Sequence, residues 1–224
     1  EDGKPQQTAF AGSQETPFNL AILLDLSGST RPDRIYMLTA AEAFIRLARD
    51  EDRVAIYALA DGHFHVVSRL TSDRQALLER ARALPEISGV SPVYDAVVLS
   101  YADELWARMG ERNALIVITD GLDNQITNQD TPSSVKFGHL EKAAQQMHAL
   151  VFPVFLRSAE RFNPKFAEAA RKNLERLATA SGGRFFAVRS LEDLAPVFPE
   201  IEQELRSVYG VAYYPANQDF DGKW

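Results

Sequence analysis

Oxygen-bearing side chains follow two apolar stretches of this chain at the points where strands should end. The stretch FNLAILLD ends at Asp25, and Ser27 and Ser29 follow at alternate positions. A second apolar run, 112–119, is followed by Asp120. Nearly continuous apolar runs of this length are typical of strands buried on both faces of a parallel sheet. Because ligand sites of such sheets lie at the carboxyl ends of the strands, we expect the two aspartates to meet there.

Paired negative charge in one cleft is costly unless a cation neutralises it. Mg²⁺ prefers oxygen ligands, and the hydroxyls of Ser27 and Ser29 would fill ligand positions without adding charge. Ser91, in a glycine-containing turn before a predicted helix, can supply a further hydroxyl. The alternative is a helix N-cap, for which Asp and Ser are preferred. An isolated Asp-x-Ser-x-Ser favours the cap, whereas its combination with Asp120 and Ser91 favours a metal site.

Strand-like and helix-like patterns alternate along the chain. Predicted strands cover 18–25, 53–60, 63–71, 112–121, 151–157, 184–188 and 209–215, and predicted helices cover 31–52, 74–84, 92–109, 138–150, 164–183 and 190–208. This alternation predicts an α/β fold with a doubly wound, mostly parallel central sheet and helices on both faces. The polar–apolar alternation of 63–71 indicates one antiparallel edge strand.

Length and composition limit the functional classes. The 224 residues suffice for one domain with its own core, which we place at 18–215. We expect 1–17 to be a strand-like N-terminal arm or a flexible tail, and 216–224 to be a C-terminal tail that continues. The absence of cysteine excludes thiolate metal sites and cysteine nucleophiles. The net charge of −7 and the scattered Lys and Arg argue against nucleic acid. No segment approaches the ~20 apolar residues of a membrane span.

The polar motifs, in this order, resemble the metal-ion-dependent adhesion site of von Willebrand factor type A domains. The family's DxSxS motif corresponds to Asp25, Ser27 and Ser29, and its T-D-G loop corresponds to Thr119-Asp120-Gly121. Many members have a threonine before a helix between these motifs, where this sequence has Ser91. Serine keeps the hydroxyl that coordination needs and lacks the methyl group. The resemblance covers about residues 18–214, nearly the whole chain.

The C-terminal part also resembles the acidobacterial group of von Willebrand factor A-related proteins. The segment ELRSVYGVAYYPAN is similar to the end of that group's domain, and SGGRFFAV is similar to a segment that precedes it. This resemblance and the absence of an initiator Met lead us to expect an exported bacterial protein, located in the periplasm, on the cell surface or outside the cell.

The resemblance implies a Rossmann-like fold and a metal-ion-dependent protein-binding function, in adhesion or as a scaffold. The ion would be Mg²⁺, with Mn²⁺ or Ca²⁺ as alternatives. Ser27, Ser29 and Ser91 would coordinate it directly, and Asp25 and Asp120 directly or through water. A Glu or Asp of a partner protein would complete the coordination. No nucleic acid and no direct membrane insertion are implied.

The loops after the strands, 30–34, 88–92 and 122–134, should form the rim that contacts the partner. The predicted rim residues are Thr30, Val90, Pro92, Gly121, Asp123 and Asn124. His63 and His65 alternate on a predicted strand and face one side, but a transition-metal site needs more such ligands. Asp95 is expected to lie in the first turn of a helix or to pack behind the metal loop.

Two other functions remain open at this stage. One is a structural domain whose metal site is vestigial, which the serine at position 91 allows. The other is a metal-dependent phosphoryl-transfer enzyme with an aspartyl nucleophile. Enzymes of the haloacid dehalogenase type carry a second acid two residues after the nucleophile, where this chain has Ser27. The sequence also lacks a G-x-S-x-G elbow and a glycine-rich phosphate loop, so we expect no enzymatic activity.

Overall fold

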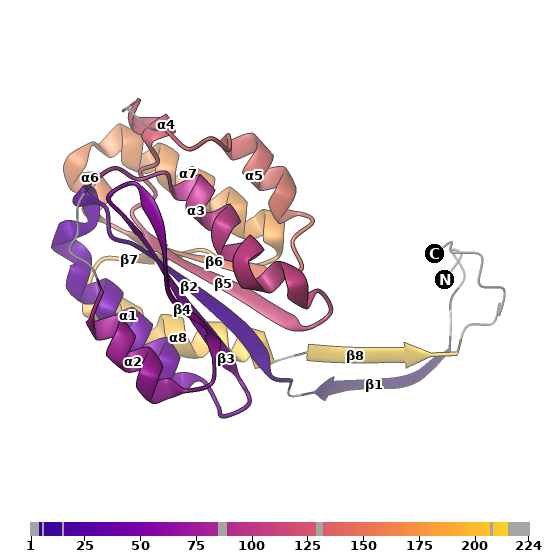
Figure 1. The fold of residues 1–224 in the computed structure, drawn as a ribbon. Helices are drawn as coiled ribbons and strands as arrows, with labels where there is room; N and C mark the ends of the chain where they lie inside the picture. Colours follow the sequence, from indigo (N-terminus) through magenta and orange to yellow (C-terminus); the bar gives the residue numbers. More distant parts are fainter. Residues whose placement is uncertain are drawn as a thin grey trace.

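The computed structural model describes residues 5, 7–14, 16–84, 89–128, 132–206 and 208–214. Its centre is a six-stranded sheet with the strand order β4-β3-β2-β5-β6-β7 (Figure 1). The strands are β2 (Phe18–Asp25), β3 (Arg53–Ala60), β4 (His63–Thr71), β5 (Arg112–Thr119), β6 (Leu150–Leu156) and β7 (Phe186–Val188). Neighbours pair in parallel except β4, which is antiparallel to β3 at the edge. The predicted mostly parallel sheet with one antiparallel edge strand is therefore confirmed.

Helices cover both faces of the sheet (Figure 1). One layer consists of α1 (Arg34–Leu47), α2 (Arg74–Arg82) and α8 (Leu191–Arg206), and the other of α3 (Val93–Ser100), α5 (Phe137–Ala144) and α7 (Pro164–Ser181). Along β2, Leu20, Ile22 and Leu24 pack under the first layer, whereas Ala21 and Leu23 pack under the second. Burial on both faces explains why this strand has no polar alternation.

Short helical turns are where the structure differs from the sequence prediction. The predicted helix 92–109 continues beyond α3 as a π-helical turn (Tyr101–Leu105) and a 3₁₀ turn (Trp106–Arg108). The loop after β5 contains α4 (Asn124–Thr127), and β6 is followed by α6 (Ser158–Phe162). A 3₁₀ helix, η1 (Gly28–Asp33), precedes α1. Elements of about one turn are too short to show a helical period in the sequence.

The two ends of the chain form a separate antiparallel ribbon outside the central sheet (Figure 1). Strand β1 (Thr8–Gln14) pairs with β8 (Val208–Tyr213). A strand at 209–215 was predicted, and its partner lies in the segment 1–17, for which a strand-like arm and a tail were the two expectations. The pairing joins opposite ends of the chain, so no local pattern could show it. The predicted tail 216–224 lies outside the described residues, and the domain boundaries stay a prediction.

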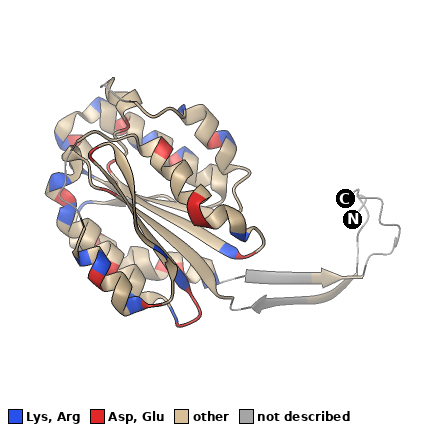
Figure 2. Ribbon diagram, viewed as in Figure 1, with Lys and Arg blue, Asp and Glu red and all other residues tan. Residues whose placement is uncertain are grey.

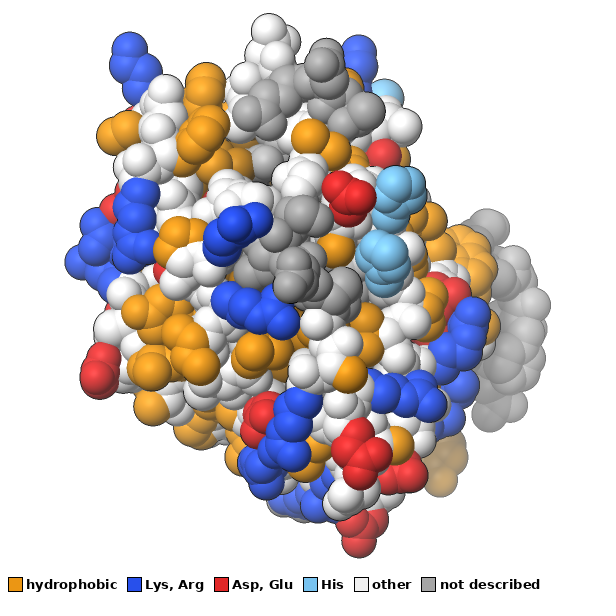
Figure 3. Space-filling view, turned by 60° about the vertical axis from the view of Figure 1, so that its left-hand side comes forward, with side chains coloured by type: hydrophobic (Ala, Val, Ile, Leu, Met, Phe, Trp, Pro, Cys, Tyr) orange, Lys and Arg blue, Asp and Glu red, His pale blue; other side chains and the backbone are white. Residues whose placement is uncertain are grey.

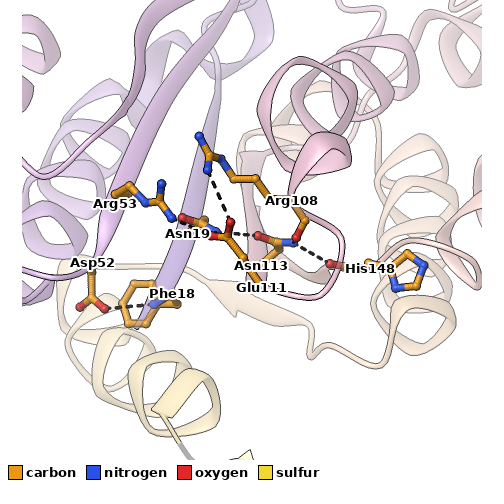
Figure 4. Close-up of polar contacts among 8 residues, drawn as sticks. All are labelled: Phe18, Asn19, Asp52, Arg53, Arg108, Glu111, Asn113 and His148. Atoms are coloured by element: carbon orange, nitrogen blue, oxygen red, sulfur yellow. Dashed lines mark hydrogen bonds and ion pairs between the residues drawn. The ribbon is translucent and has the colours of Figure 1, made fainter. Parts of the chain in front are cut away.

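A buried polar network joins β2 and β5 at their amino ends (Figure 4). Asn19 and Asn113 lie opposite each other, and the side-chain amide of Asn19 donates to Oδ1 of Asn113 at 2.9 Å and to Oε2 of Glu111 at 2.8 Å. The amide of Asn113 donates to the carbonyl oxygens of Arg108 and His148. Because these buried amides find partners only in this register, they fix the alignment of the two central strands.

An ion pair fastens the root of the terminal ribbon to the sheet. Asp52 is fully buried and accepts hydrogen bonds from the backbone N–H groups of Phe18 (3.1 Å) and Arg49 (2.7 Å). Its second oxygen, Oδ2, also accepts from Arg206 at 2.8 Å, and the Arg206 guanidinium lies 4.9 Å from the centre of the Phe18 ring. Phe18 begins β2 and Arg206 ends α8, so the contact ties together the two points at which the ribbon leaves the domain.

Charged residues lie mainly on the helices and loops, where basic and acidic residues are intermixed, whereas the strands of the central sheet carry few of them (Figure 2). In the part of the chain that the structure describes, no helix combines the length and the apolar character that crossing a membrane requires.

We predict that Asp52→Ala lowers the free energy of unfolding by about 3 kcal/mol, because the buried Arg206 loses its buried partner and two backbone donors lose their acceptor. Asp50→Ala is the matched control: Asp50 is 96% exposed and pairs with Arg74, so its loss should cost less than about 1 kcal/mol. Urea unfolding followed by circular dichroism measures both. Equal losses would contradict the structural role of the buried pair.

Candidate metal centre

The two aspartates meet where the strand order of the sheet reverses. Strands β2 and β5 are neighbours, β3 and β4 extend the sheet on one side, and β6 and β7 extend it on the other. Crossovers that leave in opposite directions open a crevice at the carboxyl ends of the two central strands. Asp25 is the last residue of β2, and Asp120 directly follows β5. Both side chains are almost completely buried in this crevice.

Hydroxyl and backbone donors surround the carboxylate of Asp25. Its Oδ1 accepts a hydrogen bond from the backbone N–H of Ser27 at 3.1 Å, and its Oδ2 accepts from Oγ1 of Thr119 at 2.6 Å. Oγ of Ser91 lies 3.2 Å from both oxygens. Burial raises the pKa of Asp25 above its usual value, since desolvation outweighs these hydrogen bonds.

Asp120 has its own donors. Its Oδ1 accepts from the backbone N–H of Leu122 at 3.1 Å, and its Oδ2 accepts from Oγ of Ser158 at 3.3 Å, with a further side-chain bond to Ser29. Burial, and then the nearby charge of Asp25, raise the pKa of Asp120 to about 7. An ionised pair is thus unfavourable in this crevice when no cation is close.

The turn after β2 brings two serine hydroxyls together. Oγ of Ser27 and Oγ of Ser29 lie 3.3 Å apart. Thr30, predicted at the rim, is fully buried and closes the turn: its Oγ1 donates to the carbonyl oxygens of Asp25 (2.6 Å) and Ser27 (3.0 Å). Ser27 precedes η1 but makes no side-chain cap hydrogen bond. The alternative in which the serine motif caps a helix is therefore not realised.

The second predicted rim loop, 88–92, reaches the two aspartates through Ser91. Backbone hydrogen bonds connect it to both other loops, since Gly28 N–H donates to the Gly89 carbonyl at 3.1 Å and Asn124 N–H donates to the Ser91 carbonyl at 3.3 Å. The Asn124 side chain in turn accepts from the Ser91 N–H at 3.3 Å. Val90 and Pro92 are half-buried. Ser88, at the start of this predicted rim loop, lies outside the described residues, as do 129–131 of the third loop.

In the third predicted rim loop, 122–134, the side chain of Asp123 points toward the interior of the protein. Asp123, predicted at the rim, is fully buried: Oδ1 caps α4 by accepting from the Gln125 N–H at 2.8 Å. Its Oδ2 accepts from the Tyr94 N–H at 3.1 Å and from Oγ of Ser133 at 2.5 Å, which fastens the loop to the start of α3. Gly121 permits this path, because its φ is +69°. Asp123 and the buried Asn124 thus support the loops from beneath.

Other predicted candidates lie apart from the two aspartates. Asp95 accepts hydrogen bonds from the backbone N–H groups of Ser134 and Val135, both at 2.8 Å, and so holds the third loop. His63 and His65 lie with their ring centres 6.4 Å apart, as the alternation predicted. Figure 3 shows a pair of histidine side chains on the surface beside an acidic one.

The donor set at the crevice fits a hard divalent cation. Two buried carboxylates lie beside the hydroxyls of Ser27, Ser29 and Ser91, an all-oxygen set of the kind that Mg²⁺ and Mn²⁺ accept. None of the largest influences on the pKa of either carboxylate comes from a basic residue. No group of three or more His, Asp or Glu residues suited to a metal occurs in the ranges that the structure describes. Two carboxylates, those of Asp25 and Asp120, therefore supply the charged ligands of the candidate centre.

The family model described as "von Willebrand factor type A domain" matches residues 20–122. Residues 20–122 therefore belong to the von Willebrand factor type A family. This range contains every residue that was predicted to bind the metal. The placement of the chain in the acidobacterial group stays a prediction.

Solved structures share the fold at low sequence identity. BatB from Bacteroides thetaiotaomicron has a TM-score of 0.60 at 15% identity, over 85% of this chain and 100% of that one. The vWF domain of the type V pili tip protein Mfa5 from Porphyromonas gingivalis has 0.62 at 13%, over 87% and 98%. Manganese-loaded TRAP of Plasmodium vivax has 0.58 at 15%, over 95% and 83%. No curated protein matches the sequence.

We predict that Asp120→Asn stabilises the metal-free protein. The amide keeps an acceptor for the Leu122 N–H and removes a buried charge that the charge of Asp25 opposes. In EDTA at pH 8, the free energy of unfolding should rise by about 1 kcal/mol or more. Urea unfolding measures the change. A loss of stability would contradict the description of the two aspartates as mutually destabilising.

Proposed function

We propose that this domain binds a partner protein through a divalent cation, Mg²⁺ or alternatively Mn²⁺ or Ca²⁺. The residues that would hold the ion are Asp25, Ser27, Ser29, Ser91 and Asp120. The observation that carries the proposal is the pair of buried carboxylates that hydroxyl groups surround. Such a pair raises the energy of the metal-free fold, and a bound cation would remove that cost.

When bound, the ion would supply positive charge and an attachment point for a carboxylate from the partner, Glu or Asp. The chain's own residues pre-orient the ligands. Thr119 holds Oδ2 of Asp25 at 2.6 Å, and the Leu122 N–H holds Oδ1 of Asp120 at 3.1 Å. Two carboxylates balance a divalent charge and the serine hydroxyls add none. The ion would therefore still attract an acidic side chain.

The partner would contact the loops around this crevice. Val90 and Pro92 are only half-buried, and we assign them to the contact surface. Thr30, Asp123 and Asn124 are buried, so their role is to shape the loops beneath that surface. The turn between β3 and β4 packs beside Val90, since a Cβ on Gly62 would lie 2.9 Å from Cγ2 of Val90.

The structural neighbours support this proposal. Mfa5 is named as a pilus tip protein, which supports an adhesive function and an exported location for this chain. TRAP was solved with manganese, which supports a divalent cation and makes Mn²⁺ a suitable probe.

One observation favours a second function, a structural domain with a vestigial site. Ser91 and Thr119 already satisfy the oxygens of Asp25 by hydrogen bonds. A hydroxyl that serves the fold in this way need not coordinate a metal. Catalysis has no comparable support: Ser27 stands where a phosphoryl-transfer enzyme would carry its second acid, and its Oγ contacts Oγ of Ser29.

The first test is calorimetric titration of the metal-stripped protein with Mg²⁺ and Mn²⁺, beside Asp25→Ala. We expect saturable binding by the native protein and none by the variant, because the variant loses a carboxylate ligand. At a hundred times its Kd, the ion should stabilise the native protein by ~2.7 kcal/mol, which thermal melts would detect. No binding by the native protein would leave the vestigial site as the explanation.

The second test addresses the partner. A phage-displayed library of random peptides is selected on the immobilised domain in Mg²⁺ and, separately, on the Asp25→Ala domain. We expect peptides from the native domain to share an Asp or Glu, and their binding to be lost in EDTA or when that acid becomes its amide. Enriched peptides without an acidic residue, or the same peptides on both domains, would contradict a metal-bridged contact.

A further inference from the structure

A fourth loop, the one that follows β6, reaches the candidate metal centre. Ser158 is the first residue of α6 and is 3% exposed. Its Oγ donates to Oδ2 of Asp120 at 3.3 Å. The motif that predicted the metal ligands involves only the segments after β2, after β5 and before α3. Nothing in it assigns a function to the end of β6.

The backbone of Ser158 is held by a different contact. Oδ2 of Asp33, in η1, accepts from the Ser158 N–H at 3.0 Å, and Oδ1 of Asp33 lies 3.6 Å from the guanidinium of Arg161. Asp33 is 3% exposed and lies 125 positions from Ser158 in the sequence. It satisfies a donor in the first turn of α6, for which Arg157 provides no side-chain cap. Through Asp33, the segment after β2 thereby fixes the position of the segment after β6.

The backbone and the hydroxyl of Ser158 therefore have different partners and different roles. The Asp33 bond positions α6 through the N–H group, which any residue except proline would supply. The Ser158 hydroxyl, in contrast, contacts Asp120. Together with the Leu122 N–H on Oδ1, it gives each oxygen of the Asp120 carboxylate a donor. The hydroxyl is therefore placed to orient this carboxylate rather than to stabilise α6.

We propose that Ser158 is a positioning residue of the metal centre and that the β6–α6 loop is a fourth structural element of the site. The inference rests on the proposed function, because Asp120 must be a metal ligand for its orientation to matter. Groups that hydrogen-bond a metal ligand commonly change metal affinity 10–100-fold when removed.

The test compares Mn²⁺ affinity, by calorimetry on the full chain, of the native protein, Ser158→Ala and Ser158→Thr. We expect Ser158→Ala to bind about 10-fold more weakly, because Oδ2 of Asp120 loses the hydrogen bond from Ser158. Ser158→Thr keeps the hydroxyl and should retain most of the affinity. Ser100→Ala is the matched control: Ser100 is also buried, and its Oγ donates to the Ala96 carbonyl at 2.8 Å, within α3.

Thermal melts in EDTA show whether a loss of affinity reflects damage to the fold. Ser158→Ala should melt no lower than Ser100→Ala, since its backbone bond to Asp33 is intact. Native affinity in Ser158→Ala would overturn this inference and leave the proposed function standing. Affinity as weak in Ser158→Thr as in Ser158→Ala would also overturn it, because the hydroxyl would then not be responsible. Absence of Mn²⁺ binding by the native protein would overturn both.

Discussion

The site depends on one constraint, the burial of two carboxylates in the same crevice. Desolvation raises the pKa of both Asp25 and Asp120, and the charge of the first raises that of the second further. The fold tolerates this because hydroxyl and backbone donors reach both side chains. Hydrogen bonds distribute the charge without cancelling it. What remains is an unfavourable charge density that a divalent cation would neutralise, so the two residues proposed to bind the ion lower the stability of the metal-free fold.

The sheet remains stable despite the two buried carboxylates because its two central strands, β2 and β5, are fixed at both ends. The pairing of β2 with β5 is apolar along most of its length and buried except at Arg112. Asn19 and Asn113 join the strands at 2.9 Å at one end, and Thr119 joins Asp25 at 2.6 Å at the other. Apolar burial supplies the stabilisation, and the polar contacts select the register. The position of the two aspartates is thus a consequence of strand alignment rather than of loop conformation.

The sequence placed the candidate ligands at the strand ends where the structure has them, whereas it described the surrounding loops less well; that these residues bind a metal stays a prediction. A strand end and an alternate spacing are local properties, so Asp25, Ser27 and Asp120 could be placed from residue type and pattern. Closeness in sequence was a poor guide for Asp123, which the turn at Gly121 and the cap of α4 direct toward the interior. Because a loop follows its tertiary contacts, the side of it that faces solvent has no periodic signature.

By itself the sequence determined the alternation of the longer strands and helices, the mostly parallel sheet, its antiparallel edge and the meeting of two aspartates, because hydrophobic periodicity and parallel connections constrain all four. Only the tertiary structure decided that β1 pairs with β8, that Asp33 holds Ser158 across 125 positions, and that Arg206 reaches Asp52. Each of these contacts joins segments far apart in the chain, so the groups that form it become neighbours only when the chain has folded.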